Sequence, residues 1–345
     1  MILYISPLAR GGVDVWMANI QRAMEQAGVP GRLCLLPHVF NFAPFLIPAA
    51  LPRGWAGAAA LVHSGSRAGF ALRAAGRPLV VTVHHLVADP IYRPYTRPAQ
   101  RLFHRLERLY DRLSIGKADA VACVSGYTRK RVVELYGRKD AQVVYNGIDT
   151  RRFRPLSGMR PTQGPFRLLF VGNRTRRKGA DLLDPLLEEL GPGFTLWYTG
   201  GQRPDEVRIR SPHAVALGTL SVDELVKAYN ACHALIFPSR LEGFGLAVAE
   251  AMACGLPIVA ARSSSLPELV VDGQGGFLCP MDDVKAIAEA VRHLAADPAL
   301  CQEMGAFNRA RAEALFSFPA MASGYQALYA RLGLEVGGDD GMGSV

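Results

Sequence analysis

Short apolar runs alternate with longer amphipathic segments along the chain. The apolar runs are four to six residues long and lack polar alternation, which is typical of strands buried on both faces of a parallel sheet. Segments such as Val15–Ala27 and Leu246–Ala253 lie between them and have helical spacing. Strand and helix in alternation predict a doubly wound α/β architecture. The predicted strands are Ile2–Ile5, Leu33–Leu36, Ala60–His63, Leu79–Val83, Ala120–Val124, Gln142–Tyr145, Phe166–Val171, Thr195–Thr199, Ala214–Leu217, Ala234–Phe237 and Pro257–Ala260.

The series of strands and helices occurs twice, and a cluster of Pro and Gly between Phe153 and Pro165 separates the two copies. We therefore expect one α/β domain over residues 1–155 and a second over 156–319. A helix in 320–336 follows and is expected to pack back on the first domain, before a flexible tail over 337–345. Ligands bind outside the carboxyl ends of parallel strands, so the active site is expected in a cleft between the two facing domains.

The segment from Phe237 to Pro257 combines a strand, a glycine loop and a helix. The first amides of a helix are unpaired donors, so a phosphate is expected at Gly245 and Leu246. Two carboxylates, Glu242 and Glu250, are suited to accept hydrogen bonds from a sugar and from a ribose diol. The residues by themselves also allow Glu242 to cap the helix and Glu250 to be solvated. The segment lacks the third glycine of GxGxxG, and the chain has no GxxxxGK[ST], so neither a Rossmann dehydrogenase nor a P-loop NTPase is supported.

The same segment resembles the signature of family-four retaining glycosyltransferases, which have the GT-B fold. The match is Pro238-Ser239, then Glu242-Gly-Phe-Gly-Leu, then Glu250-Ala-Met-Ala-x-Gly255-x-Pro257. Further matches follow the family's order and cover nearly the whole chain: Gly11-Gly12, Thr82-Val-His84, Val124-Ser125, Asn146-Gly-Ile-Asp149, Phe153-x-Pro155, Phe170-Val-Gly172, Lys178-Gly179, Gly218-x-Leu220 and Gly276-Phe-Leu278.

The resemblance implies a role for each residue of the signature segment. Glu242 would contact the hydroxyls of the donor sugar. Phe244, Gly245 and Leu246 would present backbone amides to sugar and phosphate. Glu250 would hold the ribose.

Residues outside the segment would complete the donor site. By resemblance, Gly12 would approach the diphosphate through its amide, Lys178 would neutralise the diphosphate, and Leu220 would contact the base through its backbone. The family has an arginine directly after the glycine where this chain has Asn173, and the neighbouring Arg174 is expected to replace it.

Glu242, His84 and Lys178 are the expected catalytic residues. His84 follows the Leu79–Val83 strand and would lie near the reacting centre, although a lone histidine is often structural and His85 could exchange roles with it. The implied reaction is a hexosyl transfer with retention, from a nucleoside-diphosphate-sugar to a hydroxyl of a glycan, lipid-linked or small-molecule acceptor. UDP is the default nucleotide, with GDP or ADP as alternatives. We expect no cofactor and no metal, because helix amides and Lys178 would take the place of a divalent ion.

The formal net charge of +9 suggests an anionic partner. Arg97, Arg101, Arg105, Arg108 and Arg112 share one face of a helix, beside a stripe of leucines. We favour the simple interpretation, in which the leucines pack on the domain's own sheet and the arginines are solvated. The alternatives for this Arg97–Arg112 helix are contact with an anionic membrane and recognition of an anionic or lipid-linked acceptor.

Other functional classes fit the residues less well. No RRM, KH or zinc-finger pattern accompanies the positive charge, so we expect no nucleic-acid partner. A nucleotide-sugar epimerase of the same fold would need catalytic acids and bases in the first domain, where no carboxylate cluster is evident. The six scattered cysteines and the absence of a signal peptide or a spanning apolar run predict a cytoplasmic protein, with the inner face of the membrane as its alternative place.

Overall fold

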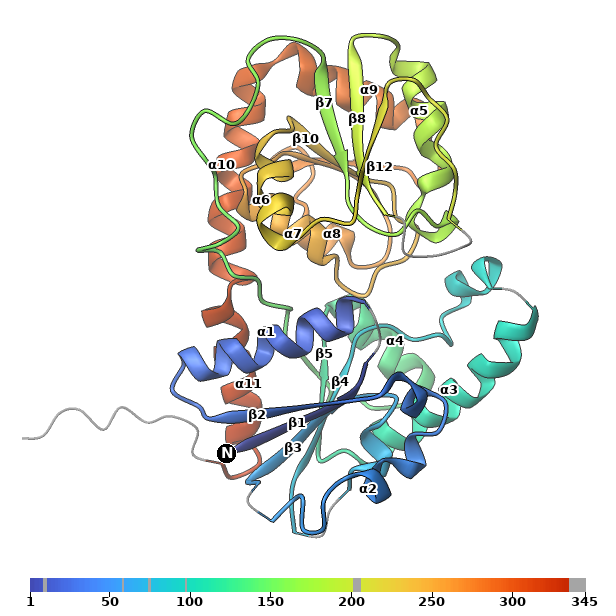
Figure 1. The fold of residues 1–345 in the computed structure, drawn as a ribbon, viewed down its shortest axis with the longest axis vertical. Coiled ribbons are helices and arrows are strands. Elements are labelled where there is room, and N and C mark those ends of the chain that lie inside the picture. The colour runs from blue at the N-terminus through green and yellow to red at the C-terminus, as the bar shows by residue number, and fades with distance from the viewer. Residues whose placement is uncertain (9–10, 58, 74–75, 97, 201–205, 335–345) are drawn as a thin grey trace, which may run out of the picture. The chain divides into compact units, whose positions relative to one another are not determined.

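The chain divides into two units, each built around a six-stranded parallel sheet (Figure 1). The first unit contains Met1–Gly147 and the segment from Leu315 onward, and the second contains Ile148–Ala314. The computed structural model describes residues 1–8, 11–57, 59–73, 76–96, 98–200 and 206–334. The expected tail over 337–345 lies outside this range.

In the first unit, the strand order is β2-β1-β3-β4-β5-β6. Adjacent residues of β4 (Leu79–Val83) point into two different cores: Val80 joins one apolar cluster, whereas Leu79 and Val81 join the other. This two-sided burial explains the uninterrupted apolar run. The other strands are β1 (Ile2–Pro7), β2 (Gly31–Leu36), β3 (Leu61–Gly65), β5 (Ala120–Cys123) and β6 (Gln142–Val143), and the helices are α1 (Gly12–Gln26), α2 (Ile47–Ala50), α3 (Pro98–Lys117), α4 (Gly126–Tyr136) and α11 (Phe318–Ala330).

The C-terminal helix α11 belongs to the first unit and packs beside α1 (Figure 1). A buried polar chain ties it to the sheet: the His63 ring lies 2.7 Å from the Tyr329 hydroxyl and 2.8 Å from Thr82 Oγ1. Burial, followed by the neighbouring His84, lowers the pKa of His63 to about 3. His63 is therefore a neutral structural histidine at physiological pH.

The second unit has the strand order β12-β11-β10-β7-β8-β9. The chain moves outward from β7 to β9 and then returns to β10 on the other side of β7, so the order reverses between β7 and β10. Such switch points are where open α/β sheets bind ligands. The strands are β7 (Phe166–Phe170), β8 (Phe194–Thr199), β9 (Ala214–Gly218), β10 (Ala234–Phe237), β11 (Ile258–Ala261) and β12 (Gly276–Cys279), and the helices are α5 (Leu183–Leu190), α6 (Val222–Asn230), α7 (Leu246–Ala253), α8 (Leu266–Leu269), α9 (Val284–Ala296) and α10 (Pro298–Leu315).

The structural division falls after Gly147, ahead of the Pro- and Gly-rich segment. Gly147 is held in the first unit, where its amide donates to Met321 Sδ at 3.0 Å and its carbonyl accepts from Asn19 at 3.0 Å. Arg154 is held in the second, where its carbonyl accepts from Asn230 at 3.0 Å. Residues 148–155 thus pack with the unit that follows them.

Helix α3 is oriented differently from the sequence-based interpretation. Leu102, Leu106 and Leu109 do not pack on the sheet; they are 67%, 46% and 48% exposed. The expectation that these leucines are buried was wrong, because polar residues on the opposite side of the helix occupy the inward positions, as described below. Arg97 lies outside the described residues. No described helix is long and apolar enough to span a membrane.

Candidate functional site

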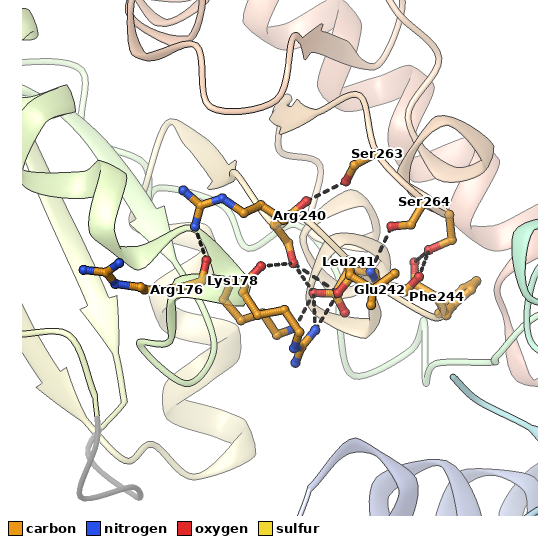
Figure 2. Close-up of polar contacts among 11 residues, drawn as sticks. Arg176, Lys178, Arg240, Leu241, Glu242, Phe244, Ser263 and Ser264 are labelled. Atoms are coloured by element: carbon orange, nitrogen blue, oxygen red, sulfur yellow. Dashed lines mark hydrogen bonds and ion pairs between the residues drawn. The ribbon is translucent and has the colours of Figure 1, made fainter. Parts of the chain in front are cut away.

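Three loops of the second unit leave the same edge of its sheet. Strands β7, β10 and β11 are parallel neighbours, so the loops after Phe170, Phe237 and Ala261 all begin at their carboxyl ends. These loops contain the residues that Figure 2 brings into one view: Lys178 from the first, Glu242 from the second and Ser264 from the third. Strand order therefore brings the glycine loop and the lysine segment to the same edge of the sheet.

Glu242 is the charged centre of this cluster (Figure 2). Its Oε1 lies 2.5 Å from Lys178 Nζ and 3.8 Å from Arg177, and it accepts a hydrogen bond from Ser239 Oγ at 2.5 Å. Burial opposes ionisation of this carboxyl group, but Lys178, Arg177 and the two hydrogen bonds together hold its pKa below the ordinary value. Glu242 is therefore an anion that is almost fully buried, 8% exposed, and paired. It does not cap α7.

Lys178 ends a single 3-10 turn, η5 (Arg176–Lys178), that follows β7. The next residue, Gly179, has φ +74°, and a Cβ there would lie 2.3 Å from the carbonyl oxygen of Pro238. Only glycine allows the lysine loop and the glutamate loop to approach this closely. The Lys178 ammonium also lies 5.1 Å from the centre of the Phe237 ring, a cation–π contact that limits where the side chain can go.

Arg240 links the glutamate loop to the lysine loop through the carbonyl of Arg176 (Figure 2). Its guanidinium is buried and pairs with Asp181 at 2.7 Å and Asp282 at 2.5 Å, and it also donates to the carbonyl of Arg176. Two carboxylates and a carbonyl within the protein thus engage the guanidinium of Arg240, which is typical of a structural cation. Its part in the site was not foreseen from the sequence.

Three consecutive serines after β11 support the glutamate loop, and sequence reasoning missed them. Ser263 Oγ donates to the carbonyl of Ser239 at 2.6 Å, and Ser265 Oγ donates to the carbonyl of Phe244 at 2.8 Å. The Glu242 amide donates to Ser264 Oγ at 2.8 Å. A run of serines at the end of a strand next to the signature strand was the signal available, but its meaning depends on strand order.

The loop then turns into α7, whose first residue is Leu246. Phe244 is buried at 3% exposure, and Gly245 occupies the N-cap position with φ +111°. Gly245 caps no amide with a side chain, so the first turn keeps donors available, and the positive end of the helix favours an anion there. The structure thus places Phe244, Gly245 and Leu246 together, with Glu242 only two residues before Phe244.

Glu250 lies one turn further along α7 and has a different environment. Its Oε2 accepts a hydrogen bond from the Tyr229 hydroxyl of α6 at 2.9 Å. Burial raises the pKa of Glu250 to about 7, and the Tyr229 hydrogen bond opposes that shift. The two carboxylates of the signature therefore differ in charge near neutral pH: Glu242 is ionised, whereas Glu250 is poised between its two forms.

Arg174 is occupied in this structure. Its guanidinium donates to Glu206 Oε2 at 2.7 Å and lies 5.3 Å from the centre of the Tyr198 ring. The arginine that accompanies Lys178 beside Glu242 is Arg177. Leu220, the expected base contact, is half-buried directly before the capping residue of α6.

The two remaining expected residues belong to the first unit. Gly12 is the first residue of α1, and its helix continues one turn to Trp16, whose ring lies 4.3 Å from that of His84. His84 Nε2 is enclosed without a hydrogen-bond partner among the described residues. Burial, and secondarily the charge of Arg67, lower the pKa of His84 to about 3. His84 is thus a neutral imidazole with one buried polar atom available.

Within the described residues, no group of three or more His, Cys, Asp and Glu is placed to hold a metal ion. The positive groups of the site are supplied by Lys178, Arg177 and the amides of α7. This combination can bind an anion with hydroxyl groups on either side, which is the shape of a diphosphate between two sugars.

Comparison with known proteins agrees with this arrangement. The family model described as Glycosyl transferases group 1 matches residues 165–297, and the one described as Glycosyltransferase Family 4 matches residues 13–152. A glycogen synthase from Mycobacterium tuberculosis is 30% identical over 330 residues, which cover 85% of this chain and 78% of the relative.

Solved structures share the fold. Sucrose-phosphate synthase from Thermosynechococcus elongatus superposes with a TM-score of 0.81 at 21% identity, over 96% of this chain and 99% of the other. HepE from Anabaena, solved with UDP and glucose, gives a TM-score of 0.74 at 19% identity, also over 96% and 99%. Two units, each with a six-stranded sheet of parallel strands in this order, form the GT-B fold. The chain belongs to the family-four glycosyltransferases, glycosyl transferases group 1.

Proposed function

We propose that this glycosyltransferase moves a sugar from a nucleoside-diphosphate-sugar to an acceptor hydroxyl with retention of configuration, without a metal ion. The observation that carries the proposal is the ion pair between buried Glu242 and half-buried Lys178, 2.5 Å apart, with Glu242 in the loop that leads into the amide end of α7. An anionic diphosphate at those amides would draw on the lysine, while the glutamate would accept from sugar hydroxyls. Glu250, one turn on, would hold the ribose.

UDP is the nucleotide we propose, with GDP or ADP as alternatives. HepE, which shares the fold, was solved with UDP and glucose, and this supports UDP as the first nucleotide to test. Leu220 would meet the base through its backbone. We assign Arg174 to the diphosphate only if a donor displaces it from Glu206, and Arg177 is the second cation that already lies beside Glu242.

The chemistry we propose needs no side-chain base. The bond from the anomeric carbon to the diphosphate oxygen breaks, the acceptor oxygen bonds to the same face of that carbon, and the acceptor proton passes to the departing phosphate oxygen. A His84 pKa of about 3 supports this path, because a group that binds protons so weakly is a poor general base at neutral pH. His84 would instead orient a hydroxyl through its buried nitrogen, and Lys178 would stabilise the developing charge on the diphosphate.

The acceptor side is assigned to the first unit. His84 would lie near the acceptor and the reacting centre, and Gly12 would approach the donor diphosphate. The acceptor is a hydroxyl of a glycan, a lipid-linked sugar or a small molecule. We propose a cytoplasmic enzyme that touches the anionic inner face of the membrane through α3.

A thermal-shift panel tests the donor. UDP, GDP and ADP, and the corresponding nucleotide-sugars, would each be added to the full chain, and a ligand at ~100 Kd should raise the free energy of unfolding by ~2.7 kcal/mol. We expect one base to dominate. No shift with any of the compounds would overturn the proposed function.

Two variants separate binding from transfer. Glu250→Ala should lose most of the shift caused by the nucleotide, whereas Glu242→Ala should retain much of it and lose sugar transfer. Equal effects of both variants on the nucleotide shift would contradict the division of roles between the two carboxylates.

A further inference from the structure

Helix α3 has its polar side turned inward and its apolar side turned outward. Glu107, Asp111 and Ser114 are buried, at 3%, 3% and 0% exposure. Leu102 and Leu106, on the opposite side, are among the open leucines of the helix. A helix that only covers its own sheet has the reverse arrangement. The outward leucines are therefore an unpartnered apolar face.

Inward contacts prevent the helix from rotating to bury these leucines. Asp111 accepts a hydrogen bond from Ser66 at 2.7 Å, and Glu107 pairs with Arg67 at 2.8 Å. Ser114 Oγ accepts from the amide of Phe70 at 2.9 Å. Rotating the helix would break these contacts and leave the Ser66 hydroxyl and the Phe70 amide without their hydrogen-bond partners, which costs free energy. The exposure of the leucines is thus a property of the folded unit.

Arginines line the leucine stripe along one flank. Arg101, Arg105, Arg108 and Arg112 are all exposed, and no hydrogen bond or ion pair to a described residue engages their guanidinium groups. The arginines repeat with the same helical spacing as the leucines, so the charged and apolar stripes run side by side along α3. The flank is strongly positive, because the acids of this helix, Glu107 and Asp111, face inward.

A neighbouring loop extends the apolar face. The Phe42 ring packs 5.1 Å from Phe103 of α3, and the backbone of Phe42 accepts from the Tyr110 hydroxyl at 3.2 Å. Phe42 is nevertheless 53% exposed, and Phe45 and Leu46 in the next turn, η2 (Pro44–Leu46), are 59% and 51% exposed. We call the following exposed residues the α3 face: Phe42, Phe45, Leu46, Leu102, Leu106, Leu109 and the four arginines.

We propose that the α3 face docks on the surface of an anionic lipid bilayer, with the leucines and phenylalanines in the headgroup–acyl boundary and the arginines on lipid phosphates. An interfacial helix needs apolar residues on one side and cations that reach phosphates at its flank, and the α3 face has both. The charge of the stripe favours a bilayer over a neutral protein groove, and exposed leucines and phenylalanines are not expected in a site for a soluble anion. This inference gives a defined surface to the membrane contact named in the proposed function, on which it rests. Docking on a bilayer does not depend on sugar transfer, so the two can be tested separately.

Flotation of the full chain with vesicles tests the proposal. Vesicles of phosphatidylcholine with roughly one third phosphatidylglycerol would be compared with pure phosphatidylcholine. Each arginine near an anionic surface contributes about fivefold to partitioning, so changing all four (Arg101, Arg105, Arg108 and Arg112) to Gln should reduce it by several hundredfold. A control with the same loss of charge at other exposed positions, Arg22, Arg32, Arg208 and Arg210→Gln, should change it much less.

The apolar half of the face has its own test. Leu102→Gln with Leu106→Gln should lower partitioning and remove the fraction that stays bound at high salt, whereas Val215→Gln with Met281→Gln, at residues of the second unit that are 45% and 47% exposed, should not. Melting curves of every variant would exclude unfolding. Absence of flotation by the wild type, or equal losses in the face and control variants, would overturn the proposal. Nucleotide-induced thermal shifts are read separately, so failure here would leave the transfer reaction standing, and the reverse also holds.

Discussion

If Glu250 holds the ribose as we propose, its raised pKa should make donor binding depend on pH. A ribose diol donates both of its hydroxyl hydrogens, so it prefers the carboxylate over the protonated acid. Burial raises the pKa of Glu250 to about 7, so the ionised fraction rises from roughly one tenth at one unit below this pKa to roughly nine tenths at one unit above it. If only the anion binds the ribose, the Kd of a nucleoside-diphosphate-sugar should fall about tenfold across this interval.

The stability of the ligand-free protein changes with pH in the opposite direction to donor affinity. A carboxyl group whose folded pKa is raised stabilises the fold most below its unfolded pKa, and this contribution is lost as pH rises through about 7. Bound donor should therefore stabilise the protein more at high pH than at low pH. Titration calorimetry with the nucleotide-sugar, from pH 6 to pH 8, measures the effect directly. The nucleotide-sugar is preferred because its diphosphate is a diester and does not titrate in this range.

Two variants identify the titrating group. Glu250→Gln keeps the shape of the side chain but cannot ionise, so the Kd of this variant for the nucleotide-sugar should be higher and independent of pH. Tyr229→Phe removes the hydrogen bond that lowers the Glu250 pKa, so the profile should move to higher pH. A flat profile in the wild type, or an unchanged slope in Glu250→Gln, would refute the assignment of the ribose to Glu250.

Three further predictions concern the pair, the metal and the backbone. Lys178→Met should reduce kcat by about 10²–10³-fold, and both it and Glu242→Gln should destabilise the fold by up to about 3 kcal/mol. The double variant Lys178→Met with Glu242→Gln should recover much of the stability but none of the activity. Additive losses of stability in melting experiments would contradict the pairing. Exhaustive chelation should leave transfer unchanged, and loss of activity that a divalent ion restores would refute metal independence. Gly276→Ala should cost at least about 2 kcal/mol, because φ is +145° and the new Cβ would lie 1.9 Å from the carbonyl oxygen of Ile258, whereas Gly193→Ala, with no atom within 4 Å, should melt like the wild type.

Most of the fold was predictable because apolar periodicity reports burial directly. The limits of β4 and β10 agree with the predicted runs, since both strands are buried on both faces. Strand β12 was recognised only as the motif around Gly276, because four residues with a glycine and a cysteine carry little periodic signal. The units divide after Gly147, ahead of the Pro- and Gly-rich segment, and the contacts of Gly147 and Arg154 show to which unit each residue belongs.

The candidate site was predictable as a set of motifs and not as a set of contacts. The sequence places Glu242, Glu250 and Lys178 at the ends of strands and in the first turns of helices. It could not reveal that Ser264 supports the glutamate loop, because that contact depends on β11 lying beside β10. It could not reveal that Glu206 holds Arg174, since nothing in the spacing of the two residues brings them together.

By itself, the sequence determined the α/β class, the repeated series and the signature of the family, because these depend on local periodicity and on residues near one another in the chain. Tertiary structure decided the charge state of each carboxylate and the direction in which α3 faces. Both depend on neighbours distant in sequence: Lys178 helps to keep Glu242 ionised, burial raises the pKa of Glu250 to about 7, and Ser66 and Arg67 hold the acids of α3 inward. Periodicity shows that a helix has two faces, but only the packing around it determines which of them is buried.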